Sequence, residues 1–185
     1  MTRPLAVTLN ALGLYAIAFV LAAAFAAQLA LHELPCPLCM LQRIQFAMLA
    51  IGPMLNIRYG PRSSHYALSL LAAVVGAAFS MRQVLLHITP GDPGYGSAIL
   101  GYHYYTWAFL GFSSAIVLLA LMLLFDRQFE THDVREQNRP GAFARVAAWL
   151  VIGLAALNIV STALECGFGA CADNPVEYEL LKLQR

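Results

Sequence analysis

The sequence predicts an all-α integral membrane protein, and three observations lead to this fold class. Of the 185 residues, 60% are hydrophobic and only 11% are charged, whereas a soluble domain carries about 25% charged residues. The mean hydropathy is +0.67. The apolar residues also gather into runs of roughly 20, the length that a helix needs to cross a bilayer. The formal net charge of +1 gives no reason to expect a nucleic-acid partner.

Five such runs follow one another along the chain. They cover approximately Leu12 to Leu31, Leu41 to Ile57, Tyr66 to Ile88, Thr106 to Phe125 and Ala142 to Leu164. Leu and Ala dominate them, and small residues recur as in close-packed membrane helices. Strand-like alternation is absent from the sequence, so a β-barrel is not expected. We expect one transmembrane domain over residues 1–185, with a core bundle at about 10–125, an extra helix at about 142–164 and a tail at 165–185.

A cleavable signal peptide is the alternative for the first run. Arg3 precedes the apolar stretch, and "AFAAQLA" contains small residues. The stretch is longer than the apolar part of most signal peptides, and its match to a cleavage site is loose. A membrane span is therefore the favoured interpretation.

The positions of Arg and Lys predict the orientation. These residues concentrate in cytoplasmic segments. They precede the first run and fill the second and fourth connections: Arg3, Arg58, Arg62, Arg127, Arg135, Arg139 and Arg145. The segments "HELPCPLC" and "TPGDPGYGSAILGYHYY" contain none, and Lys182 and Arg185 lie well beyond the last run. We expect the N-terminus inside and the C-terminus outside.

This orientation predicts that all four cysteines lie on the non-cytoplasmic face. Cys36 and Cys39 come just before the second helix, and Cys166 and Cys171 just after the fifth. Disulfides form and persist on that side of a membrane. The sequence therefore predicts two cysteine pairs in one oxidising compartment.

The first pair has the form Cys-x-x-C. Cys39 is expected at the N-terminal end of a helix, where free N–H groups and the helix dipole favour a thiolate. Arg43 lies one turn deeper and needs a partner near the bilayer, such as a thiolate or a polar cofactor head group. Redox exchange is the favoured chemistry, with a structural disulfide and a four-sulfur metal site left open. Attachment of a c-type haem is disfavoured because Met40 stands where that motif needs His.

The second pair, in "ECGFGACADNPVEYELL", is separated by four residues. Gly167 and Gly169 allow a tight turn, and so short a loop gains little stability from a crosslink. Thiol–disulfide exchange is therefore favoured over a purely structural disulfide. The nearby acids could raise thiol pKa values, select a partner or simply form a solvated face: Glu165, Asp173, Glu177 and Glu179.

These motifs resemble the disulfide bond formation protein B (DsbB) family. "CPLCMLQR" at the start of a membrane helix is similar to the family's first periplasmic loop, in which an Arg follows the second Cys by four residues. "MRQVLLHITPGDPGYG" and "YYTWAFLGF" are similar to the end of its third helix and the start of its fourth. The resemblance covers about residues 10–125 and implies a four-helix bundle, to which this chain adds a fifth transmembrane helix.

The resemblance also implies a function. It is that of a multi-pass protein of the bacterial inner membrane that reoxidises a periplasmic thioredoxin-fold dithiol oxidase (DsbA-like) and passes electrons to ubiquinone or menaquinone. Cys39 would contact the quinone, Arg43 would stabilise it, and Cys36 would exchange with the second pair. Lipid and the quinone pool are the other implied partners, and no metal is expected.

The sequence departs from the family pattern at two places. The family's second pair lies between the third and fourth helices, but residues 89–105 contain no cysteine. We interpret Cys166 and Cys171 as a relocated shuttle pair on the same face. The family often places a His near the quinone at the end of the third helix, where this chain has Arg82 and Gln83. Gln83 is a candidate quinone hydrogen-bond donor, and Arg82 is expected to extend toward the head groups.

Other functions and other residues remain open. The chain could be a transporter or a structural membrane subunit whose disulfides brace its loops, or a conduit that passes electrons outward. His103 fits an aromatic interfacial belt, although His87 and His103 could also carry protons. Met40, Met48, Met54 and Met81 are expected to pack. Gln28, Gln45 and Asn158 are expected to form interhelical hydrogen bonds.

Overall fold

A computed structural model describes residues 1–130, 141–167 and 169–182. The all-α membrane fold class is confirmed: five helical segments in these residues are long and apolar enough to span a bilayer. Their helices are α1 (Arg3–Ala30), α2 (Pro37–Leu49) with α3 (Ile51–Tyr59), α4 (Ser63–Leu86), α5 (Tyr104–Leu123) and α6 (Ala142–Cys166). The expected ends are close for four segments, but α1 begins at Arg3 rather than at Leu12.

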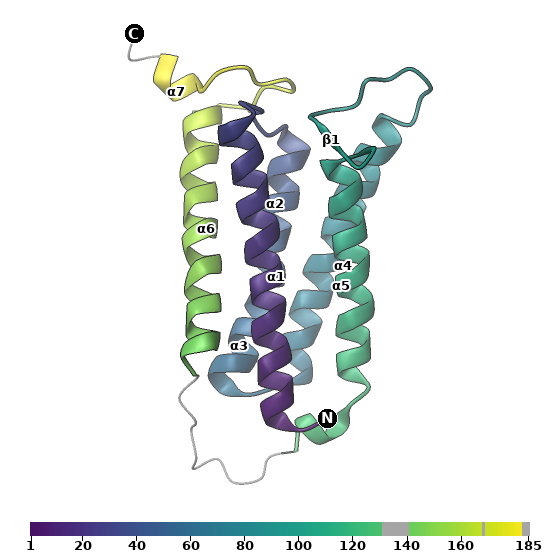
Figure 1. Cartoon of the computed structure of the whole chain (residues 1–185), viewed down its shortest axis with the longest axis vertical. Helices are drawn as coiled ribbons and strands as arrows, with labels where there is room; N and C mark the ends of the chain where they lie inside the picture. The colour runs from purple at the N-terminus through teal and green to yellow at the C-terminus, as the bar shows by residue number, and fades with distance from the viewer. Residues whose placement is uncertain (131–140, 168, 183–185) are drawn as a thin grey trace.

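The helices stand side by side in one bundle (Figure 1). α6 packs against α1 and α2, and α4 packs between α2 and α5. The N-terminus lies at one end of the bundle and the C-terminal tail at the other. We call the end where α2 begins the cysteine end, and the opposite end the arginine end.

Three short elements lie outside the spanning helices. A hairpin of β1 (Ala98–Ile99) and β2 (Tyr102–His103) precedes α5 at the cysteine end. The 3-10 turn η1 (Asp126–Gln128) follows α5 at the arginine end, and the single-turn helix α7 (Glu179–Lys182) lies in the C-terminal tail. The hairpin belongs to the 87–103 loop, which joins α4 to α5.

The second span is broken into α2 and α3 because of Pro53. Proline has no N–H, so it leaves the carbonyl of Leu49 without its helical donor. The hydroxyl of Ser69 on α4 donates to that carbonyl at 2.7 Å. Gly52 leaves room for this approach, because a Cβ there would clash with Ser69 and with the backbone of His65. The break is thereby satisfied inside the bundle, as membrane helices require.

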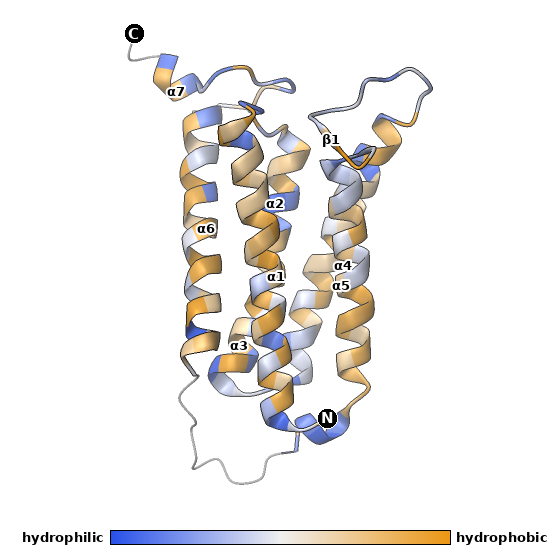
Figure 2. Ribbon diagram, in the orientation of Figure 1, coloured by the Kyte–Doolittle hydropathy of each residue, from blue (hydrophilic) through white to orange (hydrophobic). Residues whose placement is uncertain are grey.

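The middle of the bundle is apolar both inside and outside. Phe46 of α2 stacks on Phe112 of α5, with ring centroids 4.0 Å apart, in the core. Large apolar side chains also face outward, including Phe19 and Trp149, which are 73% and 70% exposed. Figure 2 shows hydrophobic residues along the length of the helices and hydrophilic ones at their ends. This distribution fits a bilayer as the surrounding solvent.

Polar side chains form a buried network at the arginine end. Asn10 donates to the hydroxyl of Tyr66 at 2.8 Å, and Tyr66 donates to Gln128 at 3.0 Å. Asn56 donates to Asn10 at 3.0 Å. These bonds join α1, α3, α4 and η1 and satisfy polar groups that burial would otherwise penalise.

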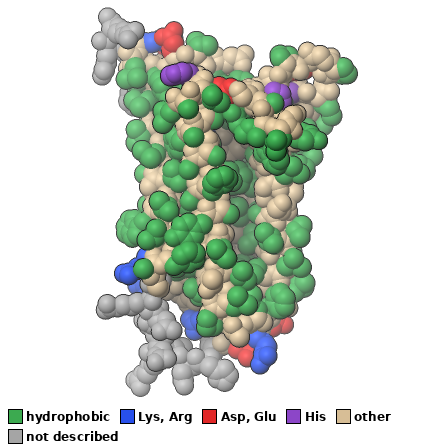
Figure 3. Space-filling view, in the orientation of Figure 1, with side chains coloured by type: hydrophobic (Ala, Val, Ile, Leu, Met, Phe, Trp, Pro, Cys, Tyr) green, Lys and Arg blue, Asp and Glu red, His purple; other side chains and the backbone are tan. Residues whose placement is uncertain are grey.

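Five of the described basic residues lie at the arginine end, where Figure 3 shows basic side chains on the visible face: Arg3, Arg58, Arg62, Arg127 and Arg145. Arg3 reaches Gly60, next to Arg58 and Arg62. Arg135 and Arg139 lie outside the described residues. The expected orientation rests on the connecting segments, since residues 31–36 and 87–103 at the cysteine end carry no Lys or Arg. The orientation itself stays a prediction.

The contact between α4 and α5 yields a stability prediction. A Cβ at Gly76 would fall on the ring of Phe112, so Gly76→Ala should lower the free energy of unfolding by about 1–3 kcal/mol through overpacking. Thermal unfolding of the detergent-solubilised protein measures this change. Gly153→Ala is the matched control, because nothing lies within 4 Å of a Cβ there. Equal stability of both variants would contradict the packing argument.

Candidate functional site

The first cysteine pair begins α2. Cys36 is the N-cap residue, and its Sγ accepts a hydrogen bond from the backbone N–H of Cys39 at 3.1 Å. Pro37 occupies the first helical turn, where its missing N–H costs nothing. Cys36 and Cys39 form a disulfide with Cα atoms 4.9 Å apart. Cys36 is buried and Cys39 is partly exposed, so Cys39 is the more accessible sulfur of this pair.

Gln83 of α4 lies against this disulfide. Its side-chain amide donates toward Cys36 Sγ at 3.2 Å and Cys39 Sγ at 3.5 Å. Its carbonyl oxygen accepts from Gln42 at 2.8 Å. Gln83 is only 2% exposed. The structure thus brings Gln83 to the first pair, but its amide is already occupied by the sulfurs and Gln42.

Arg43 is buried one turn below Cys39. Its guanidinium donates to Gln28 Oε1 at 2.6 Å and to the carbonyl of Ala24 at 3.1 Å. It also lies over the ring of Phe25, 5.2 Å from the centroid. These α1 groups hold the charge beside the first pair and account for two of the five guanidinium N–H donors.

Gln28 connects Arg43 to the last span. Its side-chain amide donates to Ser161 Oγ at 2.8 Å and to the hydroxyl of Tyr178 at 3.0 Å. Ser161 belongs to α6 and Tyr178 to the C-terminal tail. The expected interhelical role of Gln28 is confirmed, and the residue joins α1, α2, α6 and the tail in one polar network.

The second pair packs against α2, at the same end of the bundle as the first pair. Cys166 is the last residue of α6, and it forms a disulfide with Cys171. Cys166 and Cys171 are 3.7 and 4.0 Å from Met40 Sδ. Met40 is 4% exposed and directly follows Cys39. The second pair therefore contacts the residue that follows Cys39, and no sulfur–sulfur contact joins the two pairs within the described residues.

Glu165 differs from the other acids of its segment. Asp173, Glu177 and Glu179 are exposed, as a solvated face requires. Glu165 is 3% exposed, and neither carboxylate oxygen has a hydrogen-bond partner among the described residues. The solvated-face interpretation is therefore wrong for Glu165, because the end of α6 packs this side chain inward.

The 87–103 loop covers the approach to the first pair. The hydroxyl of Tyr95 donates to the carbonyl of Leu34 at 2.6 Å, two residues before Cys36. Ser97 donates to Glu33. Burial raises the pKa of Tyr95, and the negative charges of Glu165 and Glu33 raise it further. The phenol therefore stays protonated and keeps its bond to Leu34 throughout the neutral range.

The two histidines of this loop stack on one aromatic residue. The rings of His87 and His103 lie 5.5 and 5.4 Å from the ring of Tyr105. His87 Nδ1 lies 2.9 Å from Asp92. The backbone N–H of Gly94 is the main cause of the lowered pKa of Asp92, and His87 adds to it. These contacts order the loop and fit the expected interfacial role of the histidines.

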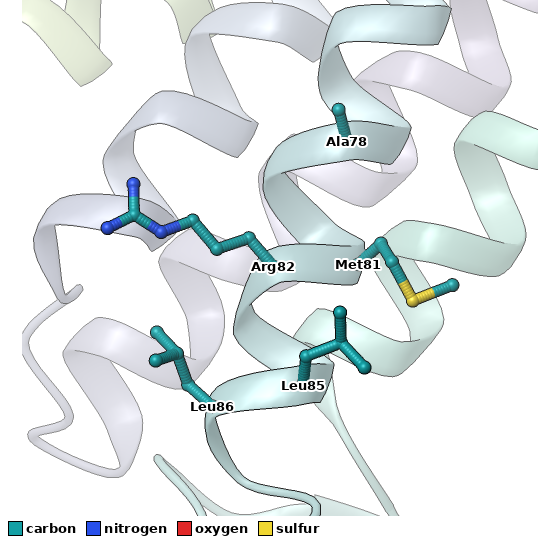
Figure 4. A pocket seen from close by; sticks show the side chains of 5 residues that line it. All are labelled: Ala78, Met81, Arg82, Leu85 and Leu86. Carbon is teal, nitrogen blue, oxygen red and sulfur yellow. The ribbon is translucent and has the colours of Figure 1, made fainter.

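Arg82 points away from the cysteines. It is exposed and lines a shallow hollow of about 430 Å³ on α4 with Ala78, Met81, Leu85 and Leu86 (Figure 4). Gln83, the next residue, faces the first pair instead. Adjacent helix positions diverge by about a quarter turn or more, so only one of them can face the sulfurs.

Sequence reasoning missed three contributors to the site. Met40 was expected only to pack, Glu165 was considered only as one of several acids that affect the thiols, select a partner or face solvent, and Tyr95 carried no expected role. Met40 and Glu165 each directly neighbour a cysteine in the sequence, and this adjacency was the available signal. Tyr95 offered no signal, because its contact depends on how the loop folds.

Comparison with known proteins identifies the N-terminal half of the chain. Residues 6–97 match the family model "Disulfide bond formation protein DsbB". Proteins named disulfide bond formation protein B from Xanthomonas axonopodis pv. citri and Xanthomonas campestris pv. campestris are 43% and 42% identical over 86 residues. Disulfide bond formation protein B 2 of Burkholderia lata is 38% identical over 85 residues.

These alignments cover 44–45% of this chain and 50% of each relative. The chain thus spans about half the length of the curated relatives it matches. The family match includes the first pair, Arg43 and Gln83, and ends before α5 and the second pair. No solved structure matches the chain significantly.

The Gln28 network yields a prediction about the C-terminal tail. Gln28→Leu removes the acceptor of buried Arg43 and the donors to Ser161 and Tyr178. Leaving such a group unpaired costs about 1–3 kcal/mol, so the tail should exchange its amide hydrogens faster, and reductant should open the second disulfide more readily. Hydrogen–deuterium exchange and timed thiol labelling measure the two effects.

Gln45→Leu is the matched control for this change. Gln45 is a partly exposed residue of α2 and is not a hydrogen-bond partner of Arg43 or Gln28. It should leave tail exchange and disulfide reduction at wild-type rates. Unchanged tail protection in Gln28→Leu would show that the network does not hold α6 and the tail in place.

Proposed function

The chain is a DsbB-like membrane protein, and on that premise we propose that it is an inner-membrane, quinone-dependent thiol oxidase. It reoxidises a periplasmic thioredoxin-fold dithiol oxidase and passes the electrons to ubiquinone or menaquinone. The observation that carries the proposal is the contact of both second-pair sulfurs with Met40, which directly follows Cys39. This arrangement supports a relay between two disulfides at one end of the bundle.

The second pair receives electrons from the soluble partner. Cys171 is the more accessible of its two sulfurs, since Cys166 is 9% exposed and Cys171 lies in the tail and is partly exposed. A partner thiolate attacks Cys171 and expels Cys166 as a thiolate. The second partner thiol then displaces Cys171, which leaves the partner oxidised and the second pair reduced.

The first pair then takes the electrons. Cys166, a thiol in the reduced pair, loses its proton and attacks Cys36 once the flexible Met40 side chain moves aside, and Cys39 leaves as a thiolate. The helix N-terminus and Arg43 favour negative charge at Cys39. Cys171 then attacks Cys166, which regenerates the second disulfide and leaves the first pair as two thiols.

The residues around Cys39 fit a quinone head group. Arg43 has N–H donors beyond those given to Gln28 and Ala24, and Cys39 is the accessible sulfur of the first pair. Bound there, the quinone would accept two electrons and two protons. Gln83 is bonded to the sulfurs and Gln42, so we assign it to positioning the disulfide rather than to binding quinone.

The proposed location follows from the same relay. Both pairs face the periplasm, where the thioredoxin-fold partner is found, and the arginine end faces the cytoplasm. The absence of Lys and Arg from residues 31–36 and 87–103, the connecting segments at the cysteine end, supports this orientation. The conduit alternative has less support, because all four cysteines form disulfides at one end of the bundle.

Quinone reduction tests the proposal. Purified protein given a reduced thioredoxin-fold dithiol oxidase should reduce added ubiquinone, which is followed by its ultraviolet absorbance. Cys39→Ser should lower the rate to background, because it removes the sulfur from which electrons leave the first pair. Arg82→Gln is a control expected to retain the wild-type rate, since Arg82 is exposed on another face of α4. Undiminished activity in Cys39→Ser would sink the proposal.

Thiol trapping in cells separates the relay from a structural role. When quinone is depleted, both pairs should accumulate as thiols, because electrons still enter and cannot leave. Disulfides that only brace loops would stay oxidised under the same conditions. That result would favour a transporter or structural subunit.

The entry point of electrons gives a separate prediction. A thioredoxin-fold partner that lacks its second active-site cysteine cannot resolve a mixed disulfide, so it should remain attached to this chain. Fragment mass spectrometry should locate the bond at Cys171, because Cys166 is buried against Met40. Cys171→Ser should give no adduct at the second pair. A bond to Cys166 in the otherwise unchanged chain would reverse the assignment.

A further inference from the structure

Glu165 is a buried carboxylate that the relay described above does not use. It lies in the last turn of α6, directly before Cys166. It is 3% exposed, and both oxygens lack a hydrogen-bond partner among the described residues. Burying such a group without partners is costly, so packing alone gives no reason to place a carboxylate there.

Two titratable groups near Glu165 come from neighbouring elements. Arg43 of α2 and Tyr95 of the 87–103 loop are close enough for its charge to act on them. Glu33 acts in turn on Tyr95, and Tyr178 of the tail on Arg43. No ion pair within 4.0 Å joins Glu165 to Arg43 in the described part of the chain. The carboxylate is therefore near a fixed positive charge but not bound to it.

The register of α2 relates this carboxylate to the sulfurs. Met40 and Arg43 are three residues apart and lie on one face of the helix. Cys166 contacts Met40, and the neighbouring Glu165 is buried in the same turn of α6. Glu165 thus lies beside the path from the second pair to the first, in a place shielded from water.

We propose that Glu165 is the proton carrier for electron transfer between the two cysteine pairs. This inference rests on the proposed relay and adds a residue to it. Exchange requires a thiolate nucleophile, and the Cys166 thiol, at 9% exposed, gives little of its surface to water. The Glu165 carboxylate supplies the missing base.

The step is balanced within the chain. The Glu165 carboxylate takes the proton of the Cys166 thiol, and the Cys166 sulfur bonds to Cys36 as the Cys36–Cys39 bond breaks. Glu165 then gives that proton to the departing Cys39 thiolate. In the second half the Cys171 sulfur bonds to Cys166 as the Cys166–Cys36 bond breaks. The proton of the Cys171 thiol passes to Cys36, and Glu165 ends as a carboxylate. The second pair is oxidised by two electrons and the first pair is reduced by two.

The test follows both pairs in protein that holds no quinone. Oxidised protein is mixed with a small dithiol, quenched with acid at intervals and labelled with maleimide, and mass spectrometry counts thiols at each pair. In the wild-type chain the second pair should open first and the first pair should follow. The delay between them gives the transfer rate, which is measured from pH 5 to 9 (about the range in which carboxyl and thiol groups titrate).

Glu165→Gln keeps the size of the side chain and removes the base. The second pair should open at the wild-type rate, while transfer to the first pair should slow by about a hundredfold, a typical contribution of general base catalysis. The part of the pH profile that depends on the carboxylate should be lost. Glu165→Asp should retain that dependence at an intermediate rate. Glu177→Gln, which alters an exposed acid beside Lys182, should match the wild type.

Each other outcome overturns a specific claim. A wild-type transfer rate in Glu165→Gln would contradict the proposal. A transfer rate lowered by an equal factor at every pH in both Glu165 variants would also contradict it, because that result indicates a structural role. If Glu165→Gln does not fold, the rate of Glu165→Asp decides, since wild-type transfer at every pH with the shorter carboxylate excludes a proton carrier. If the wild-type first pair stays oxidised while the second is reduced, the relay itself fails, independently of Glu165.

Discussion

The buried guanidinium of Arg43 is the constraint on which the cysteine end of this protein depends. A charge at the edge of a membrane span is tolerated only when it has polar partners. Gln28 is the main partner, and the bonds that fix Gln28 in turn extend to Ser161 and Tyr178. One cation therefore orders α1, α2, α6 and the tail together. The docking of α6 brings Cys166 and Cys171 onto Met40, so the position of the second disulfide is a consequence of this network.

Under the proposed relay, the network gives a physical reason why a tail would take the place of an internal loop. In the family that this chain resembles, the second pair lies between the third and fourth helices. Here the 87–103 loop has no cysteine and instead covers the start of α2, through Tyr95 on Leu34. The tail reaches the same end of the bundle because α6 adds one more crossing. Relocation thus requires an additional span and an anchor for it, and both are present.

The two ends of the bundle use polar groups differently. At the arginine end, Asn10, Asn56, Tyr66 and Gln128 satisfy one another, and the network fastens helices. At the cysteine end, Glu165 is left without a partner among the described residues and Arg43 keeps N–H donors to spare. A polar group that is buried and unsatisfied is costly to stability, and such costs commonly mark a functional site. The proposed chemistry lies at the end where this cost is found.

The sequence by itself determined the all-α membrane class and the five spans, because these follow from composition and run length. It predicted a redox role for Cys36 and Cys39 from their spacing along one segment. It also marked Arg43 and Gln83 as residues near the first pair. Only the tertiary structure decided that Met40 contacts the second disulfide, that Gln28 accepts a hydrogen bond from Arg43 and that the Glu165 side chain is buried. Each of these depends on which face of one helix meets another, and hydrophobic runs without a polar side do not encode that choice. "LPCPLCMLQR" therefore predicted the chemistry of the first pair, whereas the packing of α6 on α2 decided what that pair can exchange with.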